Sequence, residues 1–436
     1  MHTHRRFVLN IALAGAATAA SGEVTEASVE AALDGSRTIG PDAVYEKPAP
    51  TTMDELASKR TLGVSAVEVN DYVPGNYTGA LHPTPPHADM NPKKGVVVFW
   101  KDSPCRFVFS HEASYIPFLQ LPDGTAMCNN YFGGPNDSDL MYVTGRREKN
   151  NFVDIVESGP QRVWVRWNYL SLSKNGDSQP RFRGTEDYFA FPNGLLLRRI
   201  AFNSLMPNSP LGYPNMAVDL FGMLPPHLKF SDCFARDSKV GDYNVLSMLD
   251  LYGGQRYDLY SDNEGRTRRV GSVDKGDDDI LGSLGHTPGS ALVIPFRGRL
   301  LFAVLGTASG FDPKNNQFLD WSVGLPSEKP TPLILDHWPI GWSNYLDTGD
   351  RNSPYTKHFG NLFQAFVPTG KRARSWNELR AFAKDMDLNR WLEKRVFYVL
   401  LGSAREWDEI IRIGRTWLEN GANCARSDSV ANIRTS

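Results

Sequence analysis

The sequence predicts an all-β protein, either a β-propeller or a large β-sandwich, and two observations favour this fold class. Short apolar runs recur from Val96 onward, and each is closed by turn residues. Glycine and proline, with 38 and 29 residues, are abundant in this chain of 436 residues, which suits many short strands and turns. No fixed-period repeat and no WD or Kelch signature is visible. The spacing of the strands does not separate the two architectures.

The expected strands follow from these apolar runs. They cover residues 96–100, 106–109, 162–170, 188–191, 195–200, 292–296, 300–305, 333–335 and 396–401. The run that begins at Arg162 alternates as a half-buried strand does, with Val163, Val165 and Trp167 on one face. The other face, which Trp164 interrupts, holds Arg162, Arg166 and Asn168.

An Asn-Gly step separates two of these runs and predicts a β-hairpin. A loop of three residues, 192–194, is favoured because a tighter turn needs a backbone N–H that Pro192 lacks. Positions equally distant from the centre of a hairpin are cross-strand neighbours. The longer loop therefore places Tyr188 opposite Arg198, whereas a two-residue loop would place Arg199 there.

The domain organisation follows from changes in composition and residue pattern along the chain. Residues 1–20 begin with positive charge, continue with a short apolar run and end in small residues, as an export signal does, so we expect secretion with cleavage near Ser21. Residues 21–94 are Pro-rich and are expected to form an extended leader. The β domain then covers 95–420, and 421–436 form a flexible tail. Within this domain, apolar residues at helical spacing predict C-terminal helices over 376–391 and 404–418, packed on the strands.

Charge and cysteine content exclude several classes of protein. The 47 basic and 49 acidic residues give a net charge of −2, which argues against a general nucleic-acid binder. No run reaches the roughly 20 apolar residues of a membrane-spanning helix. The four cysteines include no CxxC pair, so a zinc ribbon is unsupported. A bridge between Cys105 and Cys128, which flank two expected strands, is one possible pairing.

The candidate functional residues are found by elimination. No GxSxG, P-loop, HExxH or dinucleotide-binding motif is present, and what remains is a set of His, Tyr, Arg and Asn residues at strand ends. Each also has a structural explanation, since an Arg of the hairpin can simply pair with a carboxylate across it. Glu186 and Asp187 are adjacent and point to opposite faces of a strand, so they do not form the carboxylate pair of a glycosidase.

Several segments together resemble secreted polysaccharide lyases of the ulvan-lyase type. The resemblance is found in 153–169, 186–198, 127–132, 336–339 and 413–418, and it spans most of residues 100–420. It implies a seven-bladed β-propeller that acts with His, Tyr and Arg and needs no metal cofactor, although a structural metal ion stays possible. This chain departs from the pattern of two neighbouring histidines, because Asn129 and Asn130 stand where a second His is expected after His111.

The chemistry implied is β-elimination at a uronic acid, which leaves a 4,5-unsaturated end. The reaction needs a group that neutralises the carboxylate, a base for the C5 proton and an acid for the leaving O4. Arg198 or Asn129 suits the first role, His111 the second and Tyr188 the third, or Tyr188 serves as both base and acid. The catalytic set is therefore His111, Tyr188 and Arg198, and the expected substrate-binding residues are Tyr115, Asn129, Asn130, Arg199, His337, Trp338 and His358.

Three functions are carried forward from the sequence. The first is a secreted, monomeric polysaccharide lyase that acts on a uronate-containing glycan, with no nucleic-acid or membrane partner. The second is a propeller glycoside hydrolase on the same class of glycan. The third is a non-catalytic glycan-binding protein.

Overall fold

The computed structural model divides into two units, residues 1–43 and 44–436, and every residue described below lies in the second. The structure describes residues 63–72, 93–110, 115–133, 138–139, 152–173, 180–204, 216–224, 228–254, 256–261, 267–270, 290–305, 320–324, 357–367, 396–419 and 430–433. The predicted export signal, the helix at 376–391 and the strand at 333–335 lie outside these ranges. No helix in the described ranges is long and apolar enough to cross a membrane.

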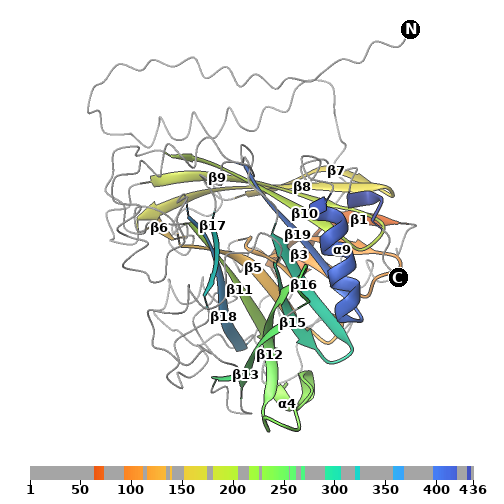
Figure 1. Ribbon diagram of the computed structural model, residues 1–436. Coiled ribbons are helices and arrows are strands. Elements are labelled where there is room, and N and C mark those ends of the chain that lie inside the picture. Colours follow the sequence, from red (N-terminus) through yellow and green to blue (C-terminus); the bar gives the residue numbers. More distant parts are fainter. Residues whose placement is uncertain are drawn as a thin grey trace. The chain divides into compact units, whose positions relative to one another are not determined.

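The described strands pair in two antiparallel sheets (Figure 1). The first sheet runs in the order β1-β2-β3-β4-β5-β11-β18-β17. Its strands are β1 (Val64–Tyr72), β2 (Lys93–Trp100), β3 (Arg106–Ser110), β4 (Pro117–Gln120), β5 (Ala126–Gly133), β11 (Met216–Leu224), β17 (Asp320–Gly324) and β18 (Lys357–Val367). The strand β1 lies within the segment expected to be a leader and forms the edge of this sheet.

The second sheet runs in the order β7-β8-β9-β10-β19-β16-β15-β12-β13-β14. Its strands are β7 (Phe152–Gly159), β8 (Arg162–Ser173), β9 (Pro180–Ala190), β10 (Leu196–Ser204), β12 (Tyr243–Asp250), β13 (Arg256–Ser261), β14 (Thr267–Val270), β15 (Ser290–Phe296), β16 (Arg299–Leu305) and β19 (Val396–Ala404). The short β6 (Ser138–Asp139) pairs with both β5 and β8 and so joins the two sheets.

The all-β prediction is confirmed, but the pairing of the described strands does not show the four-stranded blades of the predicted seven-bladed propeller. The described strands instead form two antiparallel sheets of eight and ten strands, which the short β6 joins. The sequence did not predict this arrangement, because strands that are distant in sequence pair directly with each other. For example, β19 inserts between β10 and β16, although almost two hundred residues separate it from β10.

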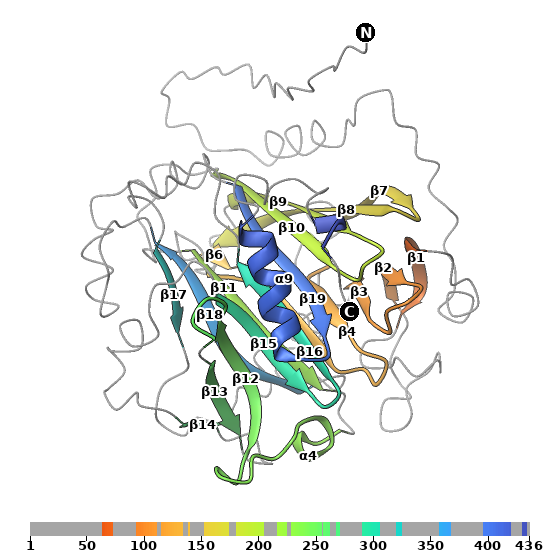
Figure 2. The same cartoon turned by 45° about the vertical axis from the view of Figure 1, so that its right-hand side comes forward.

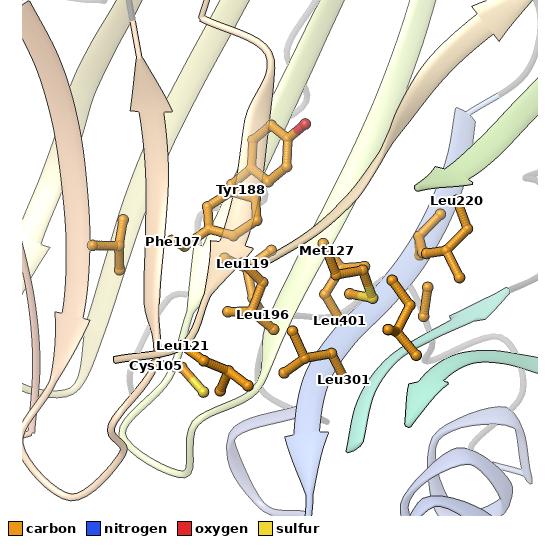
Figure 3. Packing of buried hydrophobic residues seen from close by; sticks show 14 of the residues in the cluster. Cys105, Phe107, Leu119, Leu121, Met127, Tyr188, Leu196, Leu220, Leu301 and Leu401 are labelled. Carbon is orange, nitrogen blue, oxygen red and sulfur yellow. The ribbon is translucent and has the colours of Figure 1, made fainter. Parts of the chain in front are cut away.

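The main core lies between the two sheets. Phe107, Leu119 and Met127 of the first sheet belong to the same buried cluster as Tyr188 and Leu196 of the second (Figure 3). Alternate residues of β8 reach this cluster, because successive side chains of a strand point to opposite faces. The predicted inward face of 162–170 is therefore confirmed, since Val163, Val165 and Trp167 are fully buried.

The part of the second sheet's outer face formed by β19 and β16 is covered by α9 (Trp407–Glu419), which lies against these two strands (Figure 2). Ile410, Ile413 and Trp417 lie at helical spacing and are buried there. A Cβ at Gly414 would lie 2.7 Å from Leu251, so the glycine lets the helix approach the turn after β12. The predicted C-terminal helix is confirmed. It begins three residues later than expected, because Ala404 is still the last residue of β19.

The cysteine pairing expected from the sequence is wrong. Neither Cys105 nor Cys128 forms a disulfide in the structure. The sulfur of Cys105 lies 3.4 Å from Ser403 Oγ, at hydrogen-bond distance. The two cysteines flank β3 and β4 in sequence, but sequence proximity across two strands does not bring their sulfur atoms together.

Candidate functional site

The β9–β10 hairpin positions the residues of the candidate site. The N–H of Phe191 donates to the carbonyl of Leu195 at 3.0 Å, and the N–H of Gly194 donates to the carbonyl of Phe191 at 3.1 Å. Gly194 has a φ of 83°, a conformation that favours glycine. Beyond this turn, Tyr188 is paired with Arg198. The three-residue loop predicted from the sequence is confirmed.

On the inner face of this hairpin, Glu186 accepts hydrogen bonds from three side chains. Arg198 donates to it through Nε at 2.7 Å and Nη2 at 3.0 Å, so this ion pair is bidentate. The hydroxyl of Tyr188 donates at 2.5 Å and that of Tyr169, on β8, at 3.0 Å. We call Glu186, Arg198, Tyr188 and Tyr169 the inner cluster.

Burial sets the electrostatics of the inner cluster. All four side chains are fully buried, and the aromatic rings of Phe107 and Phe109 lie 5.2 and 5.1 Å from that of Tyr188. Desolvation raises the pKa of the Tyr188 hydroxyl well above its ordinary value, and the lowering by Arg198 does not offset it because Glu186 also raises it. An arginine beside a tyrosine lowers the pKa of the hydroxyl, but here burial and Glu186 reverse the net direction.

The same causes act on the other two groups. Desolvation also raises the pKa of Tyr169, and Glu186 adds to the rise. For Arg198, burial alone would lower the pKa, but Glu186 and the two tyrosines outweigh it and the pKa is raised. The structure thus holds one charged carboxylate–guanidinium pair and two neutral tyrosines between the sheets. The pairing of a hairpin arginine with a carboxylate, which the sequence left open, occurs here.

On the outer face, Asp187 is the acceptor of a second group. Arg166 donates to it through Nε at 2.7 Å and through Nη2 at 3.3 Å, and Arg199 donates through Nη1 at 2.8 Å. The indole of Trp164 donates to the same carboxylate at 2.8 Å. We call Asp187, Arg166, Arg199 and Trp164 the outer cluster.

The outer cluster is partly open to solvent. The side chains of Arg166 and Arg199 are 26% and 36% exposed, whereas that of Asp187 is 2% exposed. The guanidinium of Arg166 lies 5.0 Å from the ring of Trp164, and the ring of Phe189 lies 5.5 Å from that of Trp164. Asp154 of β7 is the registered neighbour of Arg166, so the row contains two carboxylates and two cations, and the two cations are its partly exposed guanidinium groups.

The other predicted site residues are placed as follows. Tyr115 adopts a positive φ of 63° and packs against the core between the sheets, so the structure does not bring it to the outer cluster. His111, His337 and Trp338 lie outside the described residues. The backbones of Asn129 and Asn130 belong to β5 and that of His358 to β18, but their side chains lie outside the description. The catalytic role of His111 with Tyr188 and Arg198 stays a prediction.

Sequence reasoning missed five residues of the two clusters as site members: Glu186, Tyr169, Asp187, Arg166 and Trp164. Two signals could have found them. Adjacent carboxylates on one strand must point to opposite faces, so each needs cationic partners on its own side. The indole of Trp164 on an otherwise polar face also needs an acceptor, and Asp187 supplies it. No group of three or more possible metal ligands occurs within the described ranges.

Comparison with known proteins adds no family. No family model matches the chain, and no curated protein matches it significantly. A galactose 1-epimerase from Lactobacillus acidophilus NCFM matches with a TM-score of 0.30 and 11% identity, over 79% of this chain and 99% of that one. An amine oxidase from Aspergillus nidulans matches with a TM-score of 0.23 and 10% identity, over 84% and 55% of the two chains. Scores this low carry no argument, so function rests on the two clusters.

Proposed function

We propose that the protein binds an acidic, uronate-containing polysaccharide at the outer cluster. The observation that carries this proposal is the pair of partly exposed arginines held around buried Asp187 on neighbouring strands. Guanidinium groups are suited to carboxylates because their N–H donors match the two oxygens. Trp164 and Phe189 add a partly exposed apolar flank, which suits the C–H faces of sugars.

The strand framework supports binding without large rearrangement. Arg166, Asp187 and Arg199 form one row across β8, β9 and β10, in which each is the registered neighbour of the next. A site on paired strands is held more rigidly than one on a loop, which lowers the entropy cost of binding.

Affinity electrophoresis through gels that contain pectate, alginate or ulvan tests this function. At least one of these polysaccharides should retard the wild-type protein, and Arg166→Ala/Arg199→Ala should abolish the retardation. Arg162→Ala is a matched control, because Arg162 lies on the same face of β8, pairs with Glu157 and is 37% exposed. Equal retardation of the double variant and the wild type would contradict binding at the outer cluster.

A second candidate function is the lyase reaction on the same glycan. It is favoured by the contact of the Phe109 ring with that of Tyr188, because His111 directly follows β3 in the sequence. Removal of the C5 proton by His111 or Tyr188 and protonation of O4 would need substrate to reach the inner cluster. The 1% exposure of Tyr188 and the 0% exposure of Arg198 stand against this route and make binding the first candidate.

Absorbance of the C4=C5 double bond in the product tests the lyase candidate. A lyase gives the unsaturated product, a glycoside hydrolase cleaves without it, and a binding protein leaves the chain length unchanged. If the reaction occurs, Tyr188→Phe should lower the rate at least about a hundredfold, the usual scale for one acid–base group. Wild-type turnover in that variant would transfer the proton-transfer role to His111 or His337.

Export, a monomeric state and a reaction without a metal cofactor belong to the same proposal. N-terminal sequencing of secreted protein should begin near Ser21, because the small residues before it suit a signal peptidase. Secreted protein that begins at Met1 would contradict the predicted signal. Binding and turnover should survive a chelator, and loss of either in the chelator would reveal a metal requirement.

A further inference from the structure

The two arginines of the outer cluster use different edges of their guanidinium groups. Arg166 contacts Asp187 with Nε and Nη2, so its two-donor side edge is occupied. Arg199 contacts the same carboxylate with Nη1 alone. Nε and Nη2 of Arg199, which form the opposite edge, have no partner among the residues that the structure describes. Among the described residues, Arg166 therefore uses its two-donor edge on Asp187, and Arg199 keeps its two-donor edge unpaired.

The surroundings of Arg199 favour an anion at this free edge. Its registered neighbour on β9 is Asp187, whose oxygens already accept hydrogen bonds from Arg166, Trp164 and Arg199 Nη1. Its registered neighbour on β19 is Tyr398, which is not a carboxylate. The other nearby carboxylate in this row, Asp154, faces Arg166 from β7 and is separated from Arg199 by two strands.

Asp187 also fixes the direction of the guanidinium. The carboxylate is 2% exposed and holds Nη1 at 2.8 Å, so it acts as a template that orients the plane of Arg199. An oriented fork loses less side-chain entropy when it binds than a freely rotating one. Parallel donation from Nε and Nη2 matches two oxygens of one carboxylate, whereas a lysine ammonium offers only a point charge.

We propose that Arg199 is the specificity-determining residue of the outer cluster and that its free edge binds the carboxylate of a uronate in a bidentate manner. This inference rests on the proposed binding of an acidic polysaccharide and names the residue and the ligand group that give selectivity. Arg166 and Asp187 then act as positioning residues, because they orient the fork of Arg199 and leave its open edge to the ligand.

Calorimetric titration of Arg199→Lys tests the proposal. The probe is the pectate, alginate or ulvan oligosaccharide that the wild type binds most tightly, together with the same oligosaccharide after reduction of its carboxyl groups to hydroxymethyl groups. The wild type should prefer the carboxylated form at least tenfold. Arg199→Lys keeps the charge and loses the fork, so it should weaken binding at least tenfold and bring the preference below threefold. Arg162→Lys should match the wild type.

The outcomes separate this inference from the proposed function. If the wild type binds none of the oligosaccharides, both are overturned. If the wild type binds and the dissociation constant of Arg199→Lys stays within twofold of the wild-type value, bidentate binding by Arg199 is overturned and binding at the surface stands. Equal affinity of the wild type for the carboxylated and reduced forms of ulvan, which keeps its sulfate groups on reduction, would show recognition of sulfate and overturn the carboxylate assignment. An unchanged unfolding midpoint of Arg199→Lys excludes loss of fold as the cause.

Discussion

The inner and outer clusters are two versions of one arrangement on opposite faces of β8, β9 and β10. In each, β9 supplies a carboxylate, β10 an arginine, and β8 further donors. The inner cluster is fully buried between the sheets, whereas the arginines of the outer cluster are about one quarter and one third exposed. Because neighbouring residues of a strand point to opposite faces, the same chemistry becomes a structural element on one side and a candidate binding site on the other.

The difference in burial changes what each ion pair does. In the inner cluster, Glu186 and Arg198 are not hydrated, so each charge is stabilised by the other and by the two tyrosines. Outside, the arginines can be rehydrated if Asp187 is lost, and the energy of each pair is reduced by solvent screening. The inner cluster should therefore control stability, and the outer cluster should control binding.

The largest expected effect comes from Glu186→Gln. The variant leaves the guanidinium of Arg198 buried with no counter-charge, which should lower the free energy of unfolding by about 3–5 kcal/mol. Urea denaturation measures this change. The double variant Glu186→Gln/Arg198→Met removes the charge as well and should be more stable than Glu186→Gln alone. A double variant that is less stable would show that the unpaired charge is not the cause.

Tyr169→Phe should have an intermediate effect. It removes one hydroxyl donor to Glu186 and leaves the ring in place, so the loss should be about 1.5–3 kcal/mol, the scale of a hydrogen bond to a charged group. Urea denaturation again measures the change. Binding of the oligosaccharide should be unchanged, because Tyr169 points to the inner face. A stability change below about 0.5 kcal/mol would mean that Glu186 is satisfied without this hydroxyl.

High pH should reveal how much the two tyrosines of the inner cluster contribute to stability. The pKa values of Tyr169 and Tyr188 are raised in the folded protein, while in the unfolded chain they lie near 10. The unfolded chain therefore loses these protons first. The contribution of the two tyrosines to the free energy of unfolding is fully present below pH 10. It falls as the pH rises above 10, by at most about 1.4 kcal/mol per pH unit for each tyrosine.

Absorbance at 295 nm, followed with unfolding at each pH, measures this effect. The two tyrosines should ionise only when the protein unfolds, and Tyr169→Phe should reduce the pH dependence. Ionisation of all the tyrosines of the native protein near pH 10 would contradict the burial of the inner cluster.

Local structure could be predicted from the sequence where it depends on residues that are close together in the chain. Alternation placed Val163, Val165 and Trp167 on the inward face, and the missing N–H of Pro192 selected the loop that pairs Tyr188 with Arg198. The partners of distant strands could not be predicted, because apolar alternation says that a strand is half-buried and not which strand lies beside it. This is why a sandwich and a propeller could not be separated, and why β19 beside β10 was not foreseen.

The candidate site was predictable only in part. Arg198 and Arg199 were expected to act on substrate, and their adjacency already implied that only one of them could face outward with Asp187. Which face is the core depends on the packing of the first sheet, which places Phe107 and Phe109 against Tyr188. That information lies in long-range contacts and not in the hairpin itself.

A parallel measurement on two variants tests the division between the faces most directly. For Tyr169→Phe and Arg199→Lys, the free energy of unfolding and the dissociation constant for the uronate oligosaccharide are measured in the same buffer. Tyr169→Phe should lose stability and keep its affinity within twofold, while Arg199→Lys should change stability by less than about 0.5 kcal/mol, the usual range of a surface substitution, and lose affinity at least tenfold. The reverse pattern, with affinity lost in Tyr169→Phe and kept in Arg199→Lys, would contradict the assignment of structure to the inner face and binding to the outer face.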